Sequence, residues 1–385
     1  MPDDGAVAAD VPPRRSLPLA LLLTLLAPVA SAQLHDSAAD PAIAVVPMGD
    51  STAAPPSSDW LDRPAVIAPA ASRSLLLGLA WAGSRMVVVG ERGHVLLSDD
   101  QGRNWRQARA VPTRTMLTAV TFVDAQRGWA VGHDEIILHT TDGGETWRRQ
   151  HWAPESQQPL LAVWFADATR GIAVGAYKAF FSTQDGGTTW TRQAFEPAPL
   201  PHEGPVDPEA DVDGDAGFEP EYHLNAIAAQ GQRLWIAAEA GQLYRSDDAG
   251  GHWQTLPTPY AGSFFGLLPL GGDTLLAFGL RGHLFRSDDA GQHWFPLETG
   301  TTAMLTDGAV LSQERIVLVG LSGVVLISAD RGMSWTLHQQ PDRRGLAAVL
   351  PAGDGPLVAV GEEGVRRIEI AAAAAGDAAA AGGAR

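Results

Sequence analysis

The sequence TTDGGETW occupies residues 140–147, and five close variants of it recur along the chain. All six copies follow the pattern Ser/Thr-x-Asp-x-Gly-x-x-Trp. The other five are SDDQGRNW (98–105), TQDGGTTW (183–190), SDDAGGHW (246–253), SDDAGQHW (287–294) and SADRGMSW (328–335). Their tryptophans are 42, 43, 63, 41 and 41 residues apart, so the chain is an internal repeat with a period near 42 residues.

The residue types of this motif predict a tight hairpin. The Asp carboxylate can accept backbone N–H bonds from residues two or three positions further on, and the glycine supplies a positive φ. The Trp opens the next strand and can bury its ring between neighbouring sheets. Six regularly spaced copies indicate a structural role rather than a catalytic one. The residues assigned to this role are Asp100, Asp142, Asp185, Asp248, Asp289, Asp330, Trp105, Trp147, Trp190, Trp253, Trp294 and Trp335.

A second pattern precedes each motif, namely an apolar strand that ends in a short glycine turn, as in VVVGERGHVLLS (87–98). It occurs a seventh time in VAVGEEGVRRI (358–368), where no motif follows. A further strand, such as LTAVTFVD (117–124), starts each unit. Each unit therefore has four strands, which is the content of one propeller blade. The sequence predicts an all-β, seven-bladed β-propeller of four-stranded blades over residues 60–370.

The seventh unit stops near Ile370 without a motif or a last strand. Trp60 opens the segment WLDRPAVIAP, which is similar to WRQARAVP after Trp105. We therefore expect residues 60–70 to supply the missing strand and to close the ring, because closure removes exposed sheet edges.

The two ends of the chain have different compositions from the repeat. Residues 1–32 are typical of a cleavable signal peptide, with Arg14 and Arg15, an apolar run over 17–30 and the cleavage sequence Ala-Ser-Ala at 30–32. We expect export, most simply to the periplasm of a Gram-negative cell. Residues 33–59 are predicted to be a flexible leader, and the Ala/Gly-rich residues 371–385 a disordered tail. The chain has no cysteine, and we expect neither a metal ion nor a cofactor.

The charge distribution points to a protein partner. The net charge of −17 argues against nucleic acid as a partner. Nine of the acidic residues lie in an insertion at 196–222 that contains no Lys or Arg and explains the spacing of 63 residues. Several arginines nevertheless fall in glycine turns and blade connections, which share one face of a propeller. Arginine is suited to carboxylates and protein partners, although solvated loop charge is the alternative. The predicted partner-binding residues are Arg73, Arg92, Arg114, Arg281, Arg343 and Arg344.

The units also resemble a known family. The hairpin motifs are similar to the Asp boxes of bacterial neuraminidase repeats. The denser combination V-G-x-x-G-x-I/L-x-x-T/S-x-D-G-G-x-T-W, clearest at 131–147 and 174–190, resembles the propellers of photosystem II assembly and stability factors. This resemblance covers residues 60–370.

The resemblance implies a non-enzymatic, lumenal or periplasmic scaffold that binds exported segments of a membrane complex through an arginine patch. The matching positions in this chain are Arg92 and Arg281, with Arg114 and Arg343 nearby. The client is then a photosystem, or another inner-membrane complex or transporter, and we expect the protein to act as a monomer.

Two other classes of function remain open. A sialidase-like glycoside hydrolase acting on surface glycans would need an arginine triad, a Tyr–Glu pair and an acid Asp. The best set that the chain offers is Glu221 and Tyr222 with Arg73, Arg114 and Arg343. A purely structural interaction module is the other class, and no residue pattern separates it from an assembly factor. We expect a binding protein without catalytic residues.

Overall fold

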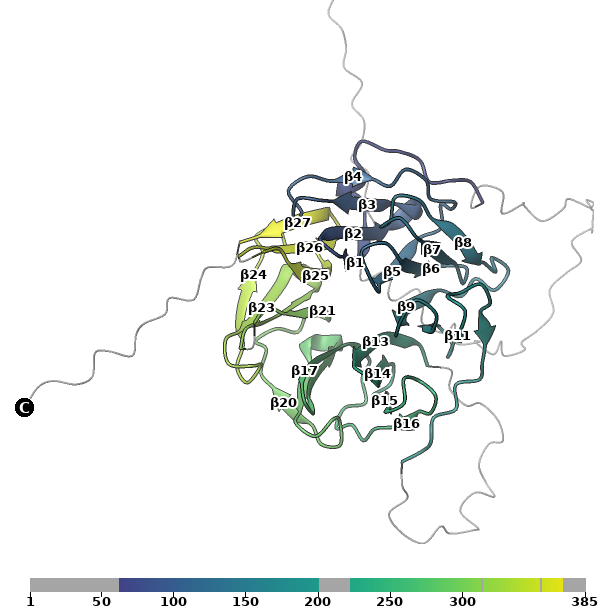
Figure 1. The fold of residues 1–385 in the computed structure, drawn as a ribbon. Helices are drawn as coiled ribbons and strands as arrows, with labels where there is room; N and C mark the ends of the chain where they lie inside the picture. Colours follow the sequence, from purple (N-terminus) through teal and green to yellow (C-terminus); the bar gives the residue numbers. More distant parts are fainter. Residues whose placement is uncertain (1–61, 201–221, 313, 354, 370–385) are drawn as a thin grey trace, which may run out of the picture.

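The computed structural model describes residues 62–200, 222–312, 314–353 and 355–369. In these residues the chain forms seven antiparallel sheets arranged in a ring (Figure 1). The predicted all-β, seven-bladed propeller is therefore confirmed.

Within each blade the strands follow one another from the inner to the outer edge. The first three blades are β1 (Leu76–Ala82), β2 (Arg85–Gly90), β3 (Val95–Ser98) and β4 (Arg106–Gln107); β5 (Leu117–Phe122), β6 (Gly128–Gly132), β7 (Ile137–Thr140) and β8 (Arg148–His151); β9 (Leu160–Phe165), β10 (Gly171–Gly175), β11 (Phe180–Thr183) and β12 (Thr191–Arg192). The next three are β13 (Leu224–Gln230), β14 (Arg233–Ala238), β15 (Leu243–Ser246) and β16 (Gln254–Thr255); β17 (Phe264–Gly271), β18 (Thr274–Gly279), β19 (Leu284–Ser287) and β20 (Phe295–Leu297); β21 (Leu305–Val310), β22 (Ile316–Gly320), β23 (Val324–Ser328) and β24 (Thr336–Gln339). Blade seven has three strands in the described residues, β25 (Leu346–Pro351), β26 (Leu357–Gly361) and β27 (Gly364–Ile368).

The described residues also form four short 3-10 turns, one before β1 and three between strands. They are η2 (Ala71–Arg73), η3 (Glu91–Gly93), η4 (Leu280–Gly282) and η5 (Leu321–Gly323). The last three are glycine turns between the second and third strands of blades one, five and six.

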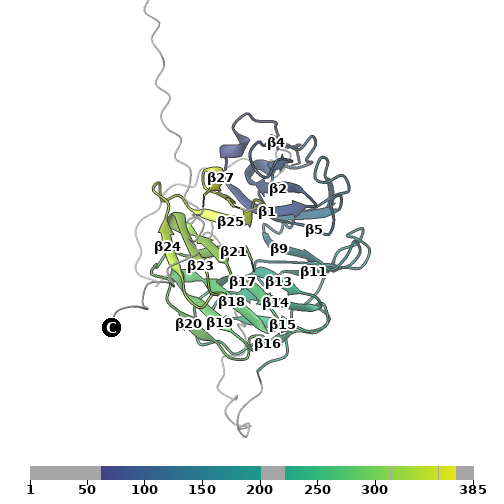
Figure 2. The ribbon, with the colours of Figure 1, turned by 60° about the vertical axis from the view of Figure 1, so that its left-hand side comes forward.

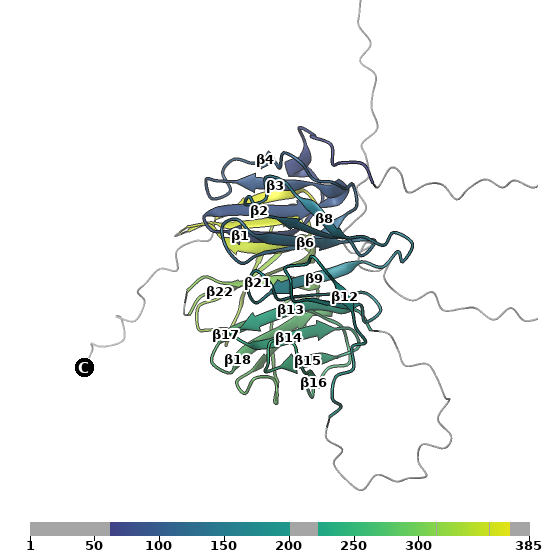
Figure 3. The same cartoon turned by 45° about the vertical axis from the view of Figure 1, so that its right-hand side comes forward.

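The second strand of each blade forms the centre of the core. Every residue of β22, and every residue of β2 after Arg85, is buried. These strands are apolar on both sides because each blade is covered by its two neighbours, which explains the unbroken apolar runs in the sequence. Figure 3 shows the blades stacked in this way around the ring.

The repeated motif forms its hairpin through side-chain oxygens. In blade one, Asp100 Oδ1 accepts the backbone N–H groups of Arg103 (3.0 Å) and Asn104 (2.9 Å). These donors lie three and four residues on, one position further than the turn chemistry suggested. The hydroxyl of Ser98 donates to Asp100 Oδ1 (2.8 Å) and accepts from Gly102 N (2.8 Å). Gly102 has φ 76°, which requires the left-handed region that glycine allows.

Each motif tryptophan packs against the blade that precedes it in the ring. Trp147 is 4% exposed and lies in one apolar cluster with Val87 and Leu97 of blade one. Trp105 of blade one packs in the same way on the cluster of blade seven that contains Val360. The tryptophans therefore join neighbouring blades rather than stabilising single sheets.

The described part of the segment predicted to close the ring takes a different place. Residues 62–70 contain no strand and run along blade one. Ala65 N–H donates to Val111 O (2.9 Å), and Ala68 N–H donates to the side chain of Gln107 (2.6 Å). Pro64, which has no N–H to donate, weakens this segment as a strand. The prediction that residues 60–70 pair with the third strand of blade seven is therefore wrong for the residues described.

The ring closes instead by direct packing of blade seven on blade one. The inner strands contact one another in order around the axis, and β25 contacts β1. Figure 2 shows β25 and β27 lying beside β1 and β2. Closure at this joint uses Trp105 against blade seven, as at the other joints.

Several sequence predictions fall on other parts of the chain. The signal peptide (1–32), the leader (33–59), the tail (371–385) and residues 201–221 of the acidic insertion lie outside the described residues. None of the helical turns in the described ranges has the length and apolar character needed to cross a membrane.

Candidate partner-binding face

The glycine turns between second and third strands hold one residue in the left-handed conformation. Arg92 has φ 57° in η3 and Arg281 has φ 58° in η4, while Ser322 has φ 57° in η5. Because serine adopts the same conformation, the turn geometry itself does not select arginine. Both arginine side chains are exposed, and neither makes a hydrogen bond or ion pair with another described residue. Their guanidinium groups are therefore available to a partner.

Blade seven brings two further arginines to the same face. Arg73 ends η2, which packs on the turn before β27; a Cβ on Gly364 would lie 2.6 Å from Arg73 Cα. Arg343 lies against η5, since a Cβ on Gly323 would lie 3.1 Å from its Cα. Arg73 and Arg343 are exposed and have no side-chain hydrogen bond or ion pair within the described ranges. They flank blade seven on its two sides.

The turn of blade one adjoins this pair. Leu75 O, two residues after Arg73, accepts the N–H of Glu91 (2.9 Å), so Arg92 follows directly along the face. We call Arg73, Arg92 and Arg343 the arginine arc, which spans blades six, seven and one. These three cations lie at successive turns around the ring although they come from different parts of the sequence.

The two remaining arginines near the arc are already engaged. Arg114 Nε donates to Pro64 O (3.0 Å), so the N-terminal segment covers part of its donor surface. Arg344 Nε pairs with Glu363 (3.0 Å), whose carboxylate also lies 3.8 Å from Arg366. Their contribution to binding is therefore smaller than the sequence suggested.

Arg281 lies just beyond the end of the arc. It is in the turn of blade five, next to blade six, against whose turn Arg343 lies, whereas blades six and seven separate it from the turn of Arg92. The structure thus places all six predicted arginines on one face but brings only part of the set together.

The same face carries paired charges at blades two and three. Glu135 is 3% exposed, and its carboxylate contacts Arg192 (2.8 Å) and His151 (3.4 Å). These groups satisfy one another inside the protein, so this part of the face offers less free charge than the arginine arc.

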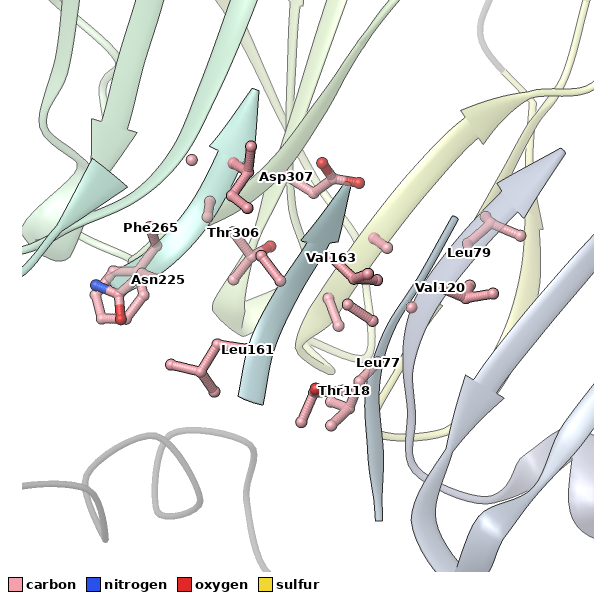
Figure 4. Close-up of a pocket in the computed structure, with 18 of the residues that line it drawn as sticks. Leu77, Leu79, Thr118, Val120, Leu161, Val163, Asn225, Phe265, Thr306 and Asp307 are labelled. Carbon is pink, nitrogen blue, oxygen red and sulfur yellow. The ribbon is translucent and has the colours of Figure 1, made fainter. Parts of the chain in front are cut away.

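A cavity of about 360 Å³ lies between the seven inner strands (Figure 4). Its lining combines larger apolar side chains such as Leu79 and Phe265 with the polar Thr118 and Asn225. The third position of the inner strand is Gly or Ala in six blades. The exception is Asp307 of blade six. The six small residues are Gly78, Ala119, Ala162, Ala226, Gly266 and Ala348.

Asp307 connects blades six and seven inside the ring. Its Oδ2 accepts the backbone N–H of Val349 in β25 (2.8 Å). Burial among apolar strands raises the pKa of Asp307 from 3.8 to about 6, and the hydrogen bonds from Val349 and Gly308 only partly oppose this shift. No cation pairs with Asp307 among the described residues. The carboxyl group therefore changes its charge close to neutral pH.

The sequence matches the family described as photosynthesis system II assembly factor YCF48, over residues 107–161 and 150–310. The chain belongs to this family. Together the two matches cover more than half of the 385 residues, from blade one to blade six. No curated protein matches the chain.

Solved structures of this family share the fold. A structure described as YCF48 bound to D1 peptide has 17% identity and a TM-score of 0.60, covering 79% of this chain and 96% of that one. YCF48 from Cyanidioschyzon merolae has 16% identity and a TM-score of 0.60, covering 77% and 96%. The GH74 xyloglucanase from Xanthomonas campestris has 15% identity and a TM-score of 0.57, covering 79% of this chain but 52% of that one. At these identities the likeness shows the fold alone.

The described residues do not bring the hydrolase set together in this YCF48-family protein. Tyr222 lies at the junction of blades three and four, where its carbonyl accepts the N–H of Lys178 (2.9 Å). Arg73, Arg114 and Arg343 lie at three other junctions, and no described contact joins them to Tyr222. Glu221 is outside the described residues. The described residues also contain no cluster of three or more His, Asp or Glu that could hold a metal ion.

Sequence reasoning missed Asp307 altogether. Aligning the third residue of the seven inner strands would have revealed it, since an acid stands where the other units have Gly or Ala. It also could not separate the free arginines from the engaged ones, because pairing partners such as Pro64 are set by the path of residues 62–70.

Proposed function

We propose that this YCF48-family protein is a non-enzymatic, exported scaffold that assists the assembly or stability of a membrane protein complex. It does so by binding extended acidic segments of a client on the arginine arc. The observation that carries the proposal is the exposure of Arg73, Arg92 and Arg343, without described partners, on one face of a protein whose net charge is −17.

Guanidinium groups suit this task because they form bidentate, charge-assisted hydrogen bonds with carboxylates. The arc extends over three blades, which fits a segment of several residues rather than a small ligand. Recognition of this kind accelerates association and weakens as salt screens the charges. Binding is therefore expected to fall steeply as ionic strength rises.

The proposal also includes export of the protein from the cytoplasm. The signal-peptide pattern of residues 1–32 supports secretion to the periplasm, where the mature chain would begin at Gln33. N-terminal sequencing of protein recovered from the periplasmic fraction should yield Gln33 first. Recovery of the uncleaved chain from the cytoplasm alone would contradict export.

The binding face is tested by affinity capture from solubilised membranes. Wild type is compared with the variant Arg73→Glu/Arg92→Glu/Arg343→Glu, and Arg281→Glu is a single charge reversal on the same face, one blade beyond the arc. We expect the wild type and Arg281→Glu to retain a membrane protein that the triple variant loses. Photosystem II or another inner-membrane complex or transporter would then be named by mass spectrometry. Equal capture by all three proteins would exclude the arc as the binding surface.

A further inference from the structure

The outer edge of blade seven differs from the other six. In blade one, Leu96 and Leu97 of β3 pair with Gln107 and Arg106 of β4. In β27 the equivalent residues are Arg366 and Arg367, and no described strand pairs with them on the outer side. Within the described residues, the backbone N–H and C=O groups along this edge are therefore open to a further strand.

A cavity of about 800 Å³ adjoins this edge, between β27 and the outer strands of blade six. Figure 2 shows β23 and β24 of blade six beside β25 and β27 of blade seven. We call it the rim socket. Its lining includes Arg315, Val325, Ile327, Leu337 and Ile368.

The repeat shows what the socket would hold in a complete blade. At the joint of blades one and two, Leu97 and Trp147 share one apolar cluster. Ile327 occupies the position of Leu97 in blade six, since both residues directly precede the motif serine. Blade seven provides no tryptophan to cover Ile327, which stays only partly buried. Ile327 thus offers an apolar surface for an aromatic ring, and no described residue of blade seven supplies that ring.

Arg315, which lines the rim socket, also has a hydrogen-bond donor without a partner among the described residues. At four joints an arginine of the preceding blade donates to the carbonyl just before the motif glycine: Arg85 to Gly143 O (3.1 Å), Arg245 to Ala290 O (3.2 Å), Arg286 to Arg331 O (2.5 Å) and Arg367 to Gln101 O (2.6 Å).

Arg315, directly before β22, holds the position in blade six that Arg85, the first residue of β2, holds in blade one. Its Nε is enclosed and has no hydrogen-bond partner in the described part of the chain. In blade one the Nε of Arg85 donates to Asp99 (2.6 Å), and blade six has Ala329 at the position of Asp99, which explains the unpaired Nε. It is Nη1 of Arg85 that reaches the motif carbonyl, so a docked segment would offer its carbonyl to the Nη groups of Arg315.

The neighbouring parts of this chain do not supply the missing side chain. Residues 370–385 follow β27 but contain no aromatic residue. Asp62, the first described residue, pairs with Arg149 of blade two (2.5 Å) and so lies away from blade seven.

We propose that the rim socket docks an extended segment of a partner protein, which adds as the fourth strand of blade seven. The segment would pair with β27 by strand addition, place an aromatic side chain on Ile327 and offer a backbone carbonyl to Arg315. This site does not use the arginine arc, so it can be correct or wrong independently of the proposed function.

The chain's own motif provides a probe. A fluorescein-labelled peptide with the sequence of residues 140–151, TTDGGETWRRQH, is titrated with the full-length protein and followed by fluorescence anisotropy. We expect saturable binding that weakens at least about tenfold when the peptide carries Trp147→Ala, because a buried aromatic anchor contributes much of such a contact. The protein variant Ile327→Glu should weaken binding as strongly, and Arg281→Glu should leave it unchanged.

The control for folding is thermal unfolding of each variant. Arg315→Gln is the second, milder test, because it removes the guanidinium donor without placing a charge on the apolar wall, and it should weaken binding several-fold. Absence of binding, or equal binding of the Trp and Ala peptides, would overturn the proposal. So would binding that appears only after deletion of residues 33–59, which would assign the socket to the chain's own leader. A wild-type dimer that Ile327→Glu converts to a monomer would assign it to a second copy.

Discussion

Replacing Asp307 by asparagine removes the carboxyl group that lines the central cavity while keeping an oxygen that can accept the N–H of Val349. The pKa of Asp307 is about 6 in the folded protein against an ordinary value of 3.8, so folding favours the protonated form. This preference stabilises the fold fully below pH 3.8 and is lost as the pH rises through 6. Two pKa units correspond to about 3 kcal/mol, and partial solvent contact through the channel lowers our expectation to about 1–2 kcal/mol.

The expected result is a variant that is more stable than the wild type at pH 7.5 and no more stable at pH 3.5. Chemical denaturation at a series of pH values measures this difference directly. Asp288→Asn is the matched control, because hydrogen bonding from Arg286 lowers the pKa of Asp288 and its replacement should therefore destabilise at neutral pH. A stability difference for Asp307→Asn that does not change between pH 3.5 and 7.5 would refute the reasoning.

Three further predictions concern stability and are measured by thermal and chemical unfolding. Trp147→Ala should cost about 3–5 kcal/mol, because the ring is buried against blade one; a loss below about 1 kcal/mol would contradict the joint described for it. Gly93→Ala should destabilise by about 2 kcal/mol more than Gly272→Ala. Both glycines have positive φ, but only at Gly93 would an added Cβ meet a carbonyl oxygen, at 2.1 Å. Equal losses of stability would exclude the steric cause. Arg192→Gln should cost about 2 kcal/mol by leaving Glu135 buried without its arginine, and adding Glu135→Gln should recover most of the loss.

Blade number was predictable because two signals repeat in register, the apolar second strand and the Asp–Gly–Trp hairpin. Each signal has a local physical cause, so the sequence alone carries it. Ring closure was not predictable in the same way. The similarity of WLDRPAVIAP to WRQARAVP indicates shared residue types, whereas the hydrogen bonds of Ala65 and Ala68 depend on where blade one presents Val111 and Gln107.

Sequence reasoning could place the glycine turns on one face of the propeller, but it could not tell which of their side chains are free. A glycine turn such as that of Arg92 places its residue on a known side of a propeller. Whether the side chain is free depends on segments distant in sequence: Glu363 engages Arg344, and Pro64 engages Arg114. These contacts arise from the folded path of the chain, which no residue pattern encodes.

The joint between β1 and β25 also bears on how the molecule folds. Six joints form between blades that are consecutive in sequence, but this one unites strands that begin about 270 residues apart. Contacts so distant in the chain form late, because a long stretch of backbone must first be ordered to bring the two ends together. Blades one to six can stack in succession as they leave the ribosome, whereas the last joint must wait for blade seven. We therefore expect the seven-bladed array to be an open spiral during most of its folding and to become a circle only in the final step.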